Sequence, residues 1–444
     1  MANHFSYSSG WRDNNPGLNR NHSKKYFTRR VTLLALCLCL LITAYLLFFP
    51  LPWYGGDTGG NNDALSAITQ PIYSKKSAPG RLLIHDVQDL NLDPSHIENR
   101  FTLQKEGIPL TVESSVDTDL QSYILSLLET SNTVRAAVVV MQPDDGRILA
   151  MVNYDSEAKG ESLCLKADYP AASLFKIISA AAALDSAGFS PEKEVTFVGR
   201  KHTLYKNQLK NKKSKYEATI SFKRAFASSI NPVFGKLGIH DLGYQAMTKS
   251  AEKFFFHRSI PFDFPVGKSE IFVPKDDFGL AELASGFNKG TTISPLHAAL
   301  LSSAVVNGGV MMRPWVVKRV VNGEGQVLYE NHESKMGVSV SPETARALRV
   351  LMKDTVIHGT CRKTFFRERR KKVYKNVELG AKTGTINDRN DEFKYDWLTA
   401  YVVPKNGRKG RKGICIAVLG IHGKILGVRA NRLGRSIIRY YLSS

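Results

Sequence analysis

Ser173 and Lys176 are the residues whose types and spacing most clearly suggest chemistry. They lie three positions apart in the run Ala171–Leu184, which is otherwise almost wholly apolar. Side chains three apart share one face of a helix and can touch. A helix this apolar on all sides is expected to be buried, and burial lowers the pKa of a lysine because it disfavours the ammonium form. A neutral lysine could take the proton of the serine hydroxyl, so the pair predicts an activated nucleophile.

The ends of this helix are indicated by Tyr169-Pro170 before it and Gly188 after it. Proline at the start and glycine at the end are the usual boundary signals. Ser173 is therefore expected in or next to the first turn, where backbone N–H groups have no partner within the helix. Those donors could receive an oxyanion.

The same spacing recurs elsewhere in the chain, for example in Ser156 with Lys159 and in Ser250 with Lys253. The first pair lies in a polar stretch that reads as an exposed loop. The second is expected on a helix with its lysine in solvent. Since nothing at either place would depress the pKa of the lysine, neither pair is expected to be catalytic, and the spacing alone is a weak pattern.

An apolar, uncharged run from Val31 to Phe49 predicts a membrane anchor at 31–50. Its length suits the hydrocarbon core of a bilayer, Lys24, Lys25, Arg29 and Arg30 precede it, and Trp53 and Tyr54 follow. A cleavable signal peptide is the alternative, but the run is longer than a usual signal core and no small-x-small cleavage site follows directly. The expected division is a cytoplasmic basic tail (1–30), the anchor (31–50), a linker with a small juxtamembrane region (51–109) and one catalytic domain (110–444) on the extracytoplasmic side.

Charge and cysteine content limit the function of the exported part. The chain of 444 residues has a net charge of +21, of which the tail contributes +5. Of the five cysteines, Cys164, Cys361 and Cys415 lie beyond the anchor, and their odd number and scattered spacing indicate no disulfide framework but at least one free buried thiol. No HExxH or CxxC motif occurs, so neither a metal nor another cofactor is expected. Nucleic acid is not an expected partner on that side of a membrane.

The order of predicted elements indicates an α+β fold. Strands are expected at 136–141, 147–153, 377–385, 396–403 and 413–419, and helices at 117–128, 342–356 and 429–442. Antiparallel strands at both ends of the domain with helices between them imply one sheet built from both ends and a helical lobe beside it.

Two basic segments, 199–215 and 362–375, interrupt this pattern. The first contains no acidic residue and the second contains only Glu368. Both are expected to be solvated loops. The functional alternative is attraction to an anionic wall polymer or to lipid phosphate near the membrane.

Three motifs together resemble a known family. Ser173-Leu174-Phe175-Lys176, Ser229-Ile230-Asn231 and Lys382-Thr383-Gly384-Thr385 are similar to the SxxK, SxN and KTGT motifs of penicillin-binding proteins and serine β-lactamases, in the same order and on the expected elements. Further segments resemble the transpeptidase domain of class B penicillin-binding proteins: Leu110-Thr111-Val112 with Gln121, the hairpin 144–152, the segment 292–310 and Asp396-Trp397.

This resemblance implies a β-lactamase/transpeptidase-like fold and a peptidoglycan D,D-transpeptidase inhibited by β-lactams. Ser173 would attack the penultimate D-alanine of a stem peptide with Lys176 as base, and Ser229 would relay a proton to the departing D-alanine. Asn231 would hold the substrate amide and Lys176, and Lys382 would bring positive charge towards the relay serine and the terminal carboxylate. Thr383 and Thr385 would bind that carboxylate, Gly384 would let the substrate lie along the strand, and the N–H groups of Ser173 and Thr385 would form the oxyanion hole.

The chain departs from the family in its N-terminal region. Class B enzymes carry a sizeable pedestal between anchor and transpeptidase, and here only 55–109 is available. Because the pedestal mediates contact with a membrane glycosyltransferase, the resemblance supports that partner only weakly. The anchor and the basic flank imply a location in the bacterial cytoplasmic membrane, with one span and a periplasmic or extracytoplasmic catalytic domain.

Other functions remain open at this point. A D,D-carboxypeptidase or a β-lactamase would hydrolyse the acyl-enzyme, but the long gap between SxN and KTGT and the lack of an ExxLN-like segment favour the transpeptidase. A non-catalytic penicillin sensor would need an output domain, which the short tail does not offer. A silent scaffold would keep the fold without being acylated.

Overall fold

The computed structural model describes residues 86–94, 97–158, 162–272, 274–388, 390–405 and 412–444. The predicted tail, the predicted anchor and the first part of the predicted linker lie outside these residues. Within the described part of the chain, no helix has the length and apolar character needed to cross a membrane.

A five-stranded antiparallel sheet forms the centre of the fold, with strand order β13-β14-β15-β3-β4. Its strands are β3 (Arg135–Met141), β4 (Ile148–Asp155), β13 (Val377–Asn387), β14 (Lys394–Pro404) and β15 (Ile414–His422). Early and late segments of the domain thus share one sheet, as the sequence predicts, and the α+β class is confirmed.

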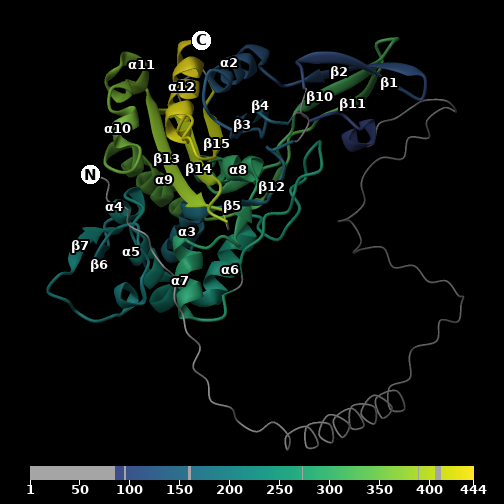
Figure 1. Ribbon diagram of the computed structural model, residues 1–444. Helices are drawn as coiled ribbons and strands as arrows, with labels where there is room; N and C mark the ends of the chain where they lie inside the picture. Colours follow the sequence, from purple (N-terminus) through teal and green to yellow (C-terminus); the bar gives the residue numbers. More distant parts are fainter. Residues whose placement is uncertain (1–85, 95–96, 159–161, 273, 389, 406–411) are drawn as a thin grey trace, which may run out of the picture. The chain divides into compact units, whose positions relative to one another are not determined.

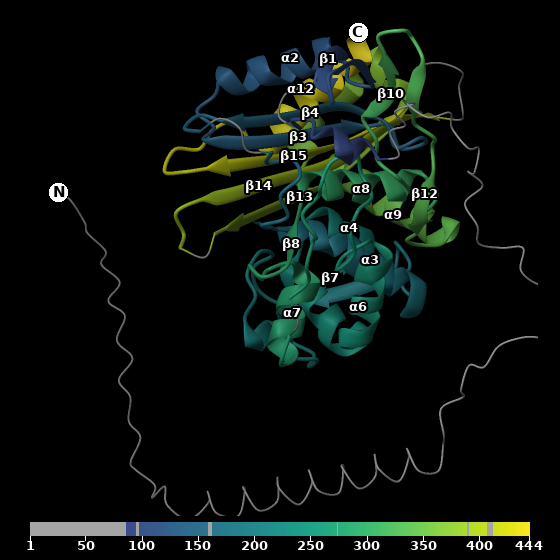
Figure 2. The same cartoon turned by 90° about the vertical axis from the view of Figure 1, so that its right-hand side faces the viewer.

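Both faces of this sheet are covered, which explains why its strands are almost continuously apolar. In β3, Ala137 and Val139 belong to one hydrophobic cluster, and Val138 and Val140 belong to the other. Helices α2 (Thr118–Glu129) and α12 (Ala430–Ser443) cover one face, and α8 (Pro295–Val306) covers the other (Figure 2). The alternation of side chains along a strand assigns successive residues to the two cores.

A helical lobe lies below α8 (Figure 1). It contains α3 (Lys176–Ser186), α4 (Phe222–Ala227), α5 (Asn231–Lys236), a π-helical turn η4 (Leu237–Leu242), α6 (Gly243–Lys253) and α7 (Asp277–Ser285). Short strand pairs β5 (Tyr169–Pro170) with β8 (Thr292–Ile293) and β6 (Glu194–Phe197) with β7 (Ala218–Ser221) complete it. Helix α9 (Pro342–Ile357) packs against both α4 and β13 and so joins the lobe to the sheet.

A second antiparallel sheet has the order β1-β2-β10-β11 and follows a 3₁₀ turn, η1 (Val87–Leu90). Its strands are β1 (Arg100–Lys105), β2 (Ile108–Ser114), β10 (Val317–Asn322) and β11 (Val327–Glu330), and β9 (Val310–Met312) pairs separately with β12 (Lys335–Val338). The domain boundary expected at residue 110 falls inside the β1–β2 hairpin. Strand β1, which begins at Arg100, therefore belongs to the same sheet as β10, because β2 pairs with both strands.

The basic segment 362–375 is not a loop. It forms α10 (Arg362–Phe365), a 3₁₀ turn η5 (Glu368–Arg370) and α11 (Lys372–Lys375). Phe365 and Tyr374 are buried and hold these short helices against the hydrophobic cluster beneath α12. The other basic segment contains a 3₁₀ turn, η3 (Lys206–Leu209), and is otherwise without helix or strand between 199 and 215.

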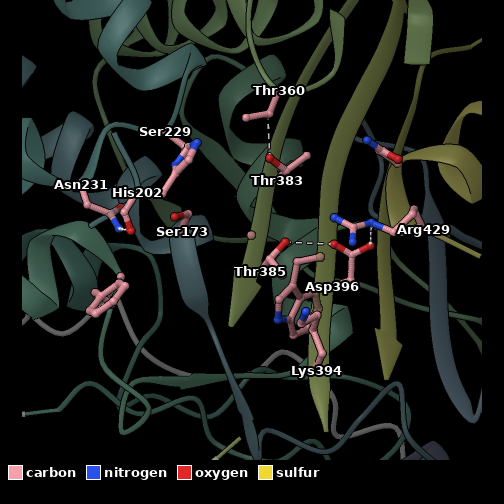
Figure 3. A pocket seen from close by; sticks show the side chains of 15 residues that line it. Ser173, His202, Ser229, Asn231, Thr360, Thr383, Thr385, Lys394, Asp396 and Arg429 are labelled. Atoms are coloured by element: carbon pink, nitrogen blue, oxygen red, sulfur yellow. Dashed lines mark hydrogen bonds and ion pairs between the residues drawn. The ribbon is translucent and has the colours of Figure 1, made fainter. Parts of the chain in front are cut away.

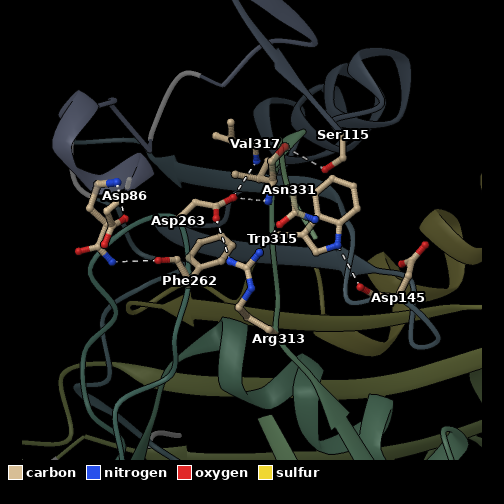
Figure 4. A network of polar contacts seen from close by, with 11 residues as sticks. Asp86, Ser115, Asp145, Phe262, Asp263, Arg313, Trp315, Val317 and Asn331 are labelled. Carbon is tan, nitrogen blue, oxygen red and sulfur yellow. Dashed lines mark hydrogen bonds and ion pairs between the residues drawn. The ribbon is translucent and has the colours of Figure 1, made fainter. Parts of the chain in front are cut away.

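A buried carboxylate joins the segment after α6 to the start of β10 (Figure 4). Asp263, 3% exposed, accepts hydrogen bonds from the N–H groups of Val316 and Val317, both at 2.7 Å, and its other oxygen lies 3.3 Å from Arg313 Nη1. Burial raises the pKa of Asp263, while these donors and the guanidinium oppose that rise. The carboxylate thus accepts hydrogen bonds from the two buried backbone N–H groups at the start of β10.

Replacing Asp263 with alanine should lower the free energy of unfolding by about 3 kcal/mol, because it leaves two backbone N–H groups without an acceptor and removes one of the side-chain acceptors of Arg313. Urea denaturation followed by near-ultraviolet circular dichroism measures this. The exposed Asp119→Ala is the control, with an expected effect of about 0.5 kcal/mol. Equal effects of the two substitutions would show that the Asp263 network does not hold the segment in place.

Candidate active site

The candidate nucleophile stands on a strained turn. Ser173 belongs to the 3₁₀ turn η2 (Ala172–Phe175), which runs directly into α3, so it occupies the first turn as predicted. Ala172 has a φ of 49°, a left-handed conformation that costs a non-glycine residue about 1 kcal/mol. Two glycines allow other chain segments to approach this turn: an added Cβ would lie 2.0 Å from Ala172 O at Gly286 and 3.3 Å from Ser173 N at Gly384.

Lys176 is fully buried beside this serine. Its Nζ lies 2.8 Å from Ser173 Oγ, 2.8 Å from Asn231 Oδ1 and 2.5 Å from Ser285 O. Within the described residues no carboxylate pairs with it. Burial, and then the charge of Lys382, lower the pKa of Lys176 well below its ordinary value. A neutral amine with a free electron pair next to the hydroxyl can accept its proton.

A second serine and lysine lie on the other side of the same site. Lys382 on β13 is also fully buried, and its Nζ donates to Ser229 Oγ at 3.0 Å and to Thr383 O at 2.7 Å. Burial lowers the pKa of Lys382 to about 7. Ser229, in the loop between α4 and α5, has a φ of 54°. Ser229 is thus itself in the left-handed conformation, whereas Ser173 directly follows a left-handed residue, Ala172.

Polar side chains continue along β13 away from the lysines (Figure 3). Thr383 Oγ1 lies 2.7 Å from Thr360 Oγ1, and Thr385 donates to Asp396 Oδ1 on the paired strand at 3.0 Å. Although burial raises the pKa of Asp396, the nearby His422 imidazole at 3.9 Å, hydrogen bonds from the Ala430 N–H and Thr385, and the charge of Arg429 hold it below its ordinary value. Asp396 is therefore a carboxylate that fixes Thr385 and Arg429.

These residues surround one cleft of about 420 Å³. Its lining comprises Ser173, His202, Ser229, Asn231, Gly286, Phe287, Thr360, Thr383, Gly384, Thr385, Lys394, Asp396, Trp397, Arg429 and Asn431. Lys176 and Lys382 lie behind it. Strand β13 is an edge strand of the sheet, so its unpaired side could receive an extended peptide as an added strand.

The structure thus brings together all eight residues that the sequence singles out, whereas Ser156, Ser250 and Lys253 of the other pairs are not among the residues that line the cleft. Ser156 is exposed, and Ser250 donates to Ile178 O while Lys253 lies in solvent. The three cysteines beyond the predicted anchor are all free and buried, which confirms the expected free thiol.

Several residues at or behind the cleft had no signal in the sequence. Ser285 contributes its backbone carbonyl to Lys176, and the type of a residue does not predict where its carbonyl will lie. His202 falls inside the basic segment 199–215, and its carbonyl accepts a hydrogen bond from Asn231 Nδ2 at 3.1 Å. Burial lowers the pKa of its imidazole, although a hydrogen bond with the Ser229 backbone opposes this shift. Thr360 comes from the turn after α9, and Arg429 from the residue before α12.

Comparison with known proteins agrees with this geometry. The family model for the penicillin binding protein transpeptidase domain matches residues 136–409. The chain is 26% identical to stage V sporulation protein D of Bacillus subtilis over 66% of its own length and 46% of that protein. It is 25% identical to the peptidoglycan D,D-transpeptidase PbpA of Mycobacterium tuberculosis over 68% of its length and 66% of that protein. The chain therefore spans from about half to two thirds of the length of these relatives.

Solved structures show the same fold. The ceftriaxone acyl-enzyme complex of penicillin-binding protein A from M. tuberculosis superposes with a TM-score of 0.60 at 22% identity, covering 74% of this chain and 80% of that one. The aztreonam complex of penicillin-binding protein 3 from the same organism gives a TM-score of 0.59 at 18% identity, covering 75% and 78%.

Replacing Gly384 with alanine should slow acylation of Ser173 by about tenfold, since the new Cβ would lie 3.1 Å from Ala172 Cβ and push on the nucleophile turn. Intact mass spectrometry of the chain after reaction with a small thioester measures the rate. Gly423→Ala is the control, because its added Cβ meets nothing closer than 3.6 Å. An unchanged rate in Gly384→Ala would mean that the close approach of β13 does not position the serine.

Proposed function

The chain belongs to the family of penicillin-binding protein transpeptidases, and from that premise we propose that it is a peptidoglycan D,D-transpeptidase that cross-links stem peptides and is inhibited by β-lactams. One observation carries the proposal. Ser173 Oγ lies 2.8 Å from the Nζ of a fully buried lysine that no described carboxylate neutralises. This arrangement suits acyl transfer through a serine ester at neutral pH.

In the acylation step, Ser173 Oγ attacks the carbonyl carbon of the penultimate D-alanine while Lys176 Nζ accepts its proton. The N–H groups of Ser173 and Thr385 stabilise the oxyanion, a contribution whose loss typically costs about 10²–10³ in rate. The peptide C–N bond then breaks. The proton that Lys176 accepted passes through Ser229 to the leaving amine of the terminal D-alanine, and the Ser229 hydroxyl also contacts the Lys382 ammonium at 3.0 Å.

The donor peptide lies along the free edge of β13. Gly384 presents no side chain to it, and Asn231 binds its amide. The terminal carboxylate lies near the hydroxyls of Thr383 and Thr385, at the end of the cleft where Lys394 and Arg429 add positive charge. In the second step a neutral amine of a neighbouring stem peptide attacks the ester carbonyl and forms the cross-link. The ester C–O bond breaks, and a proton from the amine passes through Lys176 to Ser173 Oγ.

Hydrolysis of the acyl-enzyme is the alternative, as in a D,D-carboxypeptidase or a β-lactamase. It requires a base that activates water. None of the described residues lining the cleft is a glutamate, and the one aspartate, Asp396, is engaged by Thr385, Arg429 and the Ala430 N–H. The described lining thus offers no free carboxylate to activate water, and this supports transfer to an amine over hydrolysis.

The location is also part of this proposal. The domain limits of the sequence prediction (1–30, 31–50, 51–109 and 110–444) make the chain a single-pass protein of the bacterial cytoplasmic membrane with its catalytic domain outside the cytoplasm. A membrane glycosyltransferase partner would supply the glycan strands whose peptides are joined. The support for these statements is the apolar run that ends at Phe49 and its basic flank.

The purified chain should form a stable covalent adduct with a fluorescent penicillin, and Ser173→Ala should abolish it. Fluorescence of the denatured protein on a gel measures the adduct. Ser156→Ala, which alters a serine with the same spacing to a lysine, should label like the wild type. Rapid turnover of the antibiotic would point to a β-lactamase instead, and labelling that persists in Ser173→Ala would refute the assignment of the nucleophile.

The second-order rate constant for acylation by a penicillin should show a bell-shaped dependence on pH, which reports groups of the free enzyme. Lys176 must be neutral, so the rate falls at acid pH as Lys176 takes up a proton. Lys382 must be charged to attract the carboxylate of the penicillin, so the rate falls again as pH rises through about 7. Stopped-flow fluorescence over a range of pH measures both limbs.

Lys382→Arg provides the control for this profile, because an arginine stays charged throughout the range. Its alkaline limb should disappear while its acid limb remains. An alkaline limb that is unchanged in Lys382→Arg would assign that titration to another group.

A further inference from the structure

One strongly basic surface is not used by the proposed reaction. We define the basic face as the cations of the segment 362–375 together with Arg435 and Arg439 of α12; the segment's cations are Arg362, Lys363, Arg367, Arg369, Arg370, Lys371, Lys372 and Lys375. Helices α10 and α11 lie beside α12 and the start of β13 (Figure 1), and both arginines of α12 act electrostatically on Tyr374 of α11. Two segments that are distant in the sequence therefore form one charged surface.

Acidic side chains in the described part of the chain neutralise little of this charge. The one acid of the segment, Glu368, is 5% exposed and pairs with Lys371. Within the described residues, none of the other cations of the basic face forms an ion pair. Burial, and then the neighbouring Arg362 and Arg370, lower the pKa of the Arg369 guanidinium, so these cations repel one another. An external polyanion would remove that repulsion.

Two apolar side chains stand among these cations. Phe366 is 40% exposed and Val373 is 37% exposed, and the guanidinium of Arg370 lies 4.3 Å from the centre of the Phe366 ring. A soluble polyanion offers apolar side chains nothing to contact. The interface of a bilayer accepts both kinds of group, because its headgroups are charged and its acyl boundary is apolar.

The sequence places a predicted anchor close to this domain. The apolar run ends at residue 49 and the described domain begins at residue 86, so 36 residues separate them. A random coil of that length has a root-mean-square span of about 35 Å, which is the reach expected of the predicted linker. A domain held at such a distance meets the membrane surface continually, and a basic surface is attracted when that membrane is anionic.

From these observations we propose that the basic face docks on anionic phospholipid headgroups, with Phe366 and Val373 inserted at the acyl boundary. The docking would also orient the active site. Thr360, whose hydroxyl contacts Thr383, lies two residues before Arg362, so the cleft begins where the basic face ends. A docked domain would therefore hold its cleft at a fixed angle to the membrane surface.

Hydrogen–deuterium exchange of the full chain in liposomes tests this proposal. Amides of the segment 362–375 should exchange about tenfold more slowly in liposomes that contain phosphatidylglycerol than in liposomes of pure phosphatidylcholine. The difference should vanish at high salt. Equal exchange in the two lipids would overturn the proposal. So would the same protection in phosphatidylcholine liposomes with added soluble polyphosphate, because that result would make the surface a site for a soluble polyanion.

Two matched charge reversals provide the specificity control. The variant Arg367→Glu with Arg370→Glu and Lys372→Glu should lose the protection. The variant Lys212→Glu with Lys213→Glu and Lys215→Glu carries the same change of charge in the other basic segment and should keep the protection. Loss of protection in both variants would show that net charge alone causes the effect and would overturn the proposal. Should the first variant fold poorly, the lipid and salt dependence of the wild type still decides the outcome. Penicillin labelling of the same samples tests the proposed function separately, since protection does not depend on acylation.

Discussion

The site depends on the burial of two lysines for which the described residues provide no counter-charge. Lys176 and Lys382 are both fully inaccessible, and hydroxyl, amide and carbonyl oxygens are their hydrogen-bond partners. Each also lies over an aromatic ring, Phe234 at 5.5 Å for Lys176 and Phe226 at 5.6 Å for Lys382. Such surroundings stabilise a charge less than water does, so both lysines have lowered pKa values. For Lys176, that loss of solvation makes a neutral amine available next to Ser173.

The remainder of the fold keeps this unfavourable arrangement in place. Ala172, before the nucleophile, and Ser229, the proposed relay residue, both adopt left-handed backbone conformations, which persist only where the surrounding packing imposes them. Gly286 and Gly384 press against the first turn, and α9 joins the helical lobe to the strand that carries Lys382. The carboxylate of Asp396 extends this order to the far end of the cleft by holding Thr385 and Arg429. Stability elsewhere in the domain thus supports strain at the site.

The sequence predicts those features that side-chain type and periodicity determine. Strand β3 is recognisable because both its faces are buried and its residues are all apolar after Arg135, and Ser173 is recognisable because a lysine interrupts an apolar helix. The contacts made by the Ser285 carbonyl and by Thr360 could not be predicted, since they depend on how distant loops fold over the site. The helices at 362–375 were missed because the repulsion of eight cations hides the two buried anchors, Phe365 and Tyr374, that fold them. The cations of this segment are therefore held on short helices with fixed positions and not on a loop.

The central claim is that Ser173 carries an acyl group and passes it to an amine. Rapid-quench mass spectrometry of the chain with a pentapeptide ending in D-alanyl-D-alanine tests it directly, with and without an added D-amino acid as acceptor. The account predicts an ester on Ser173 whose mass equals the donor less one D-alanine, and its conversion to the amide of the acceptor. Release of the hydrolysed peptide alone in the presence of the acceptor, or an acyl group found on any other residue, would contradict it.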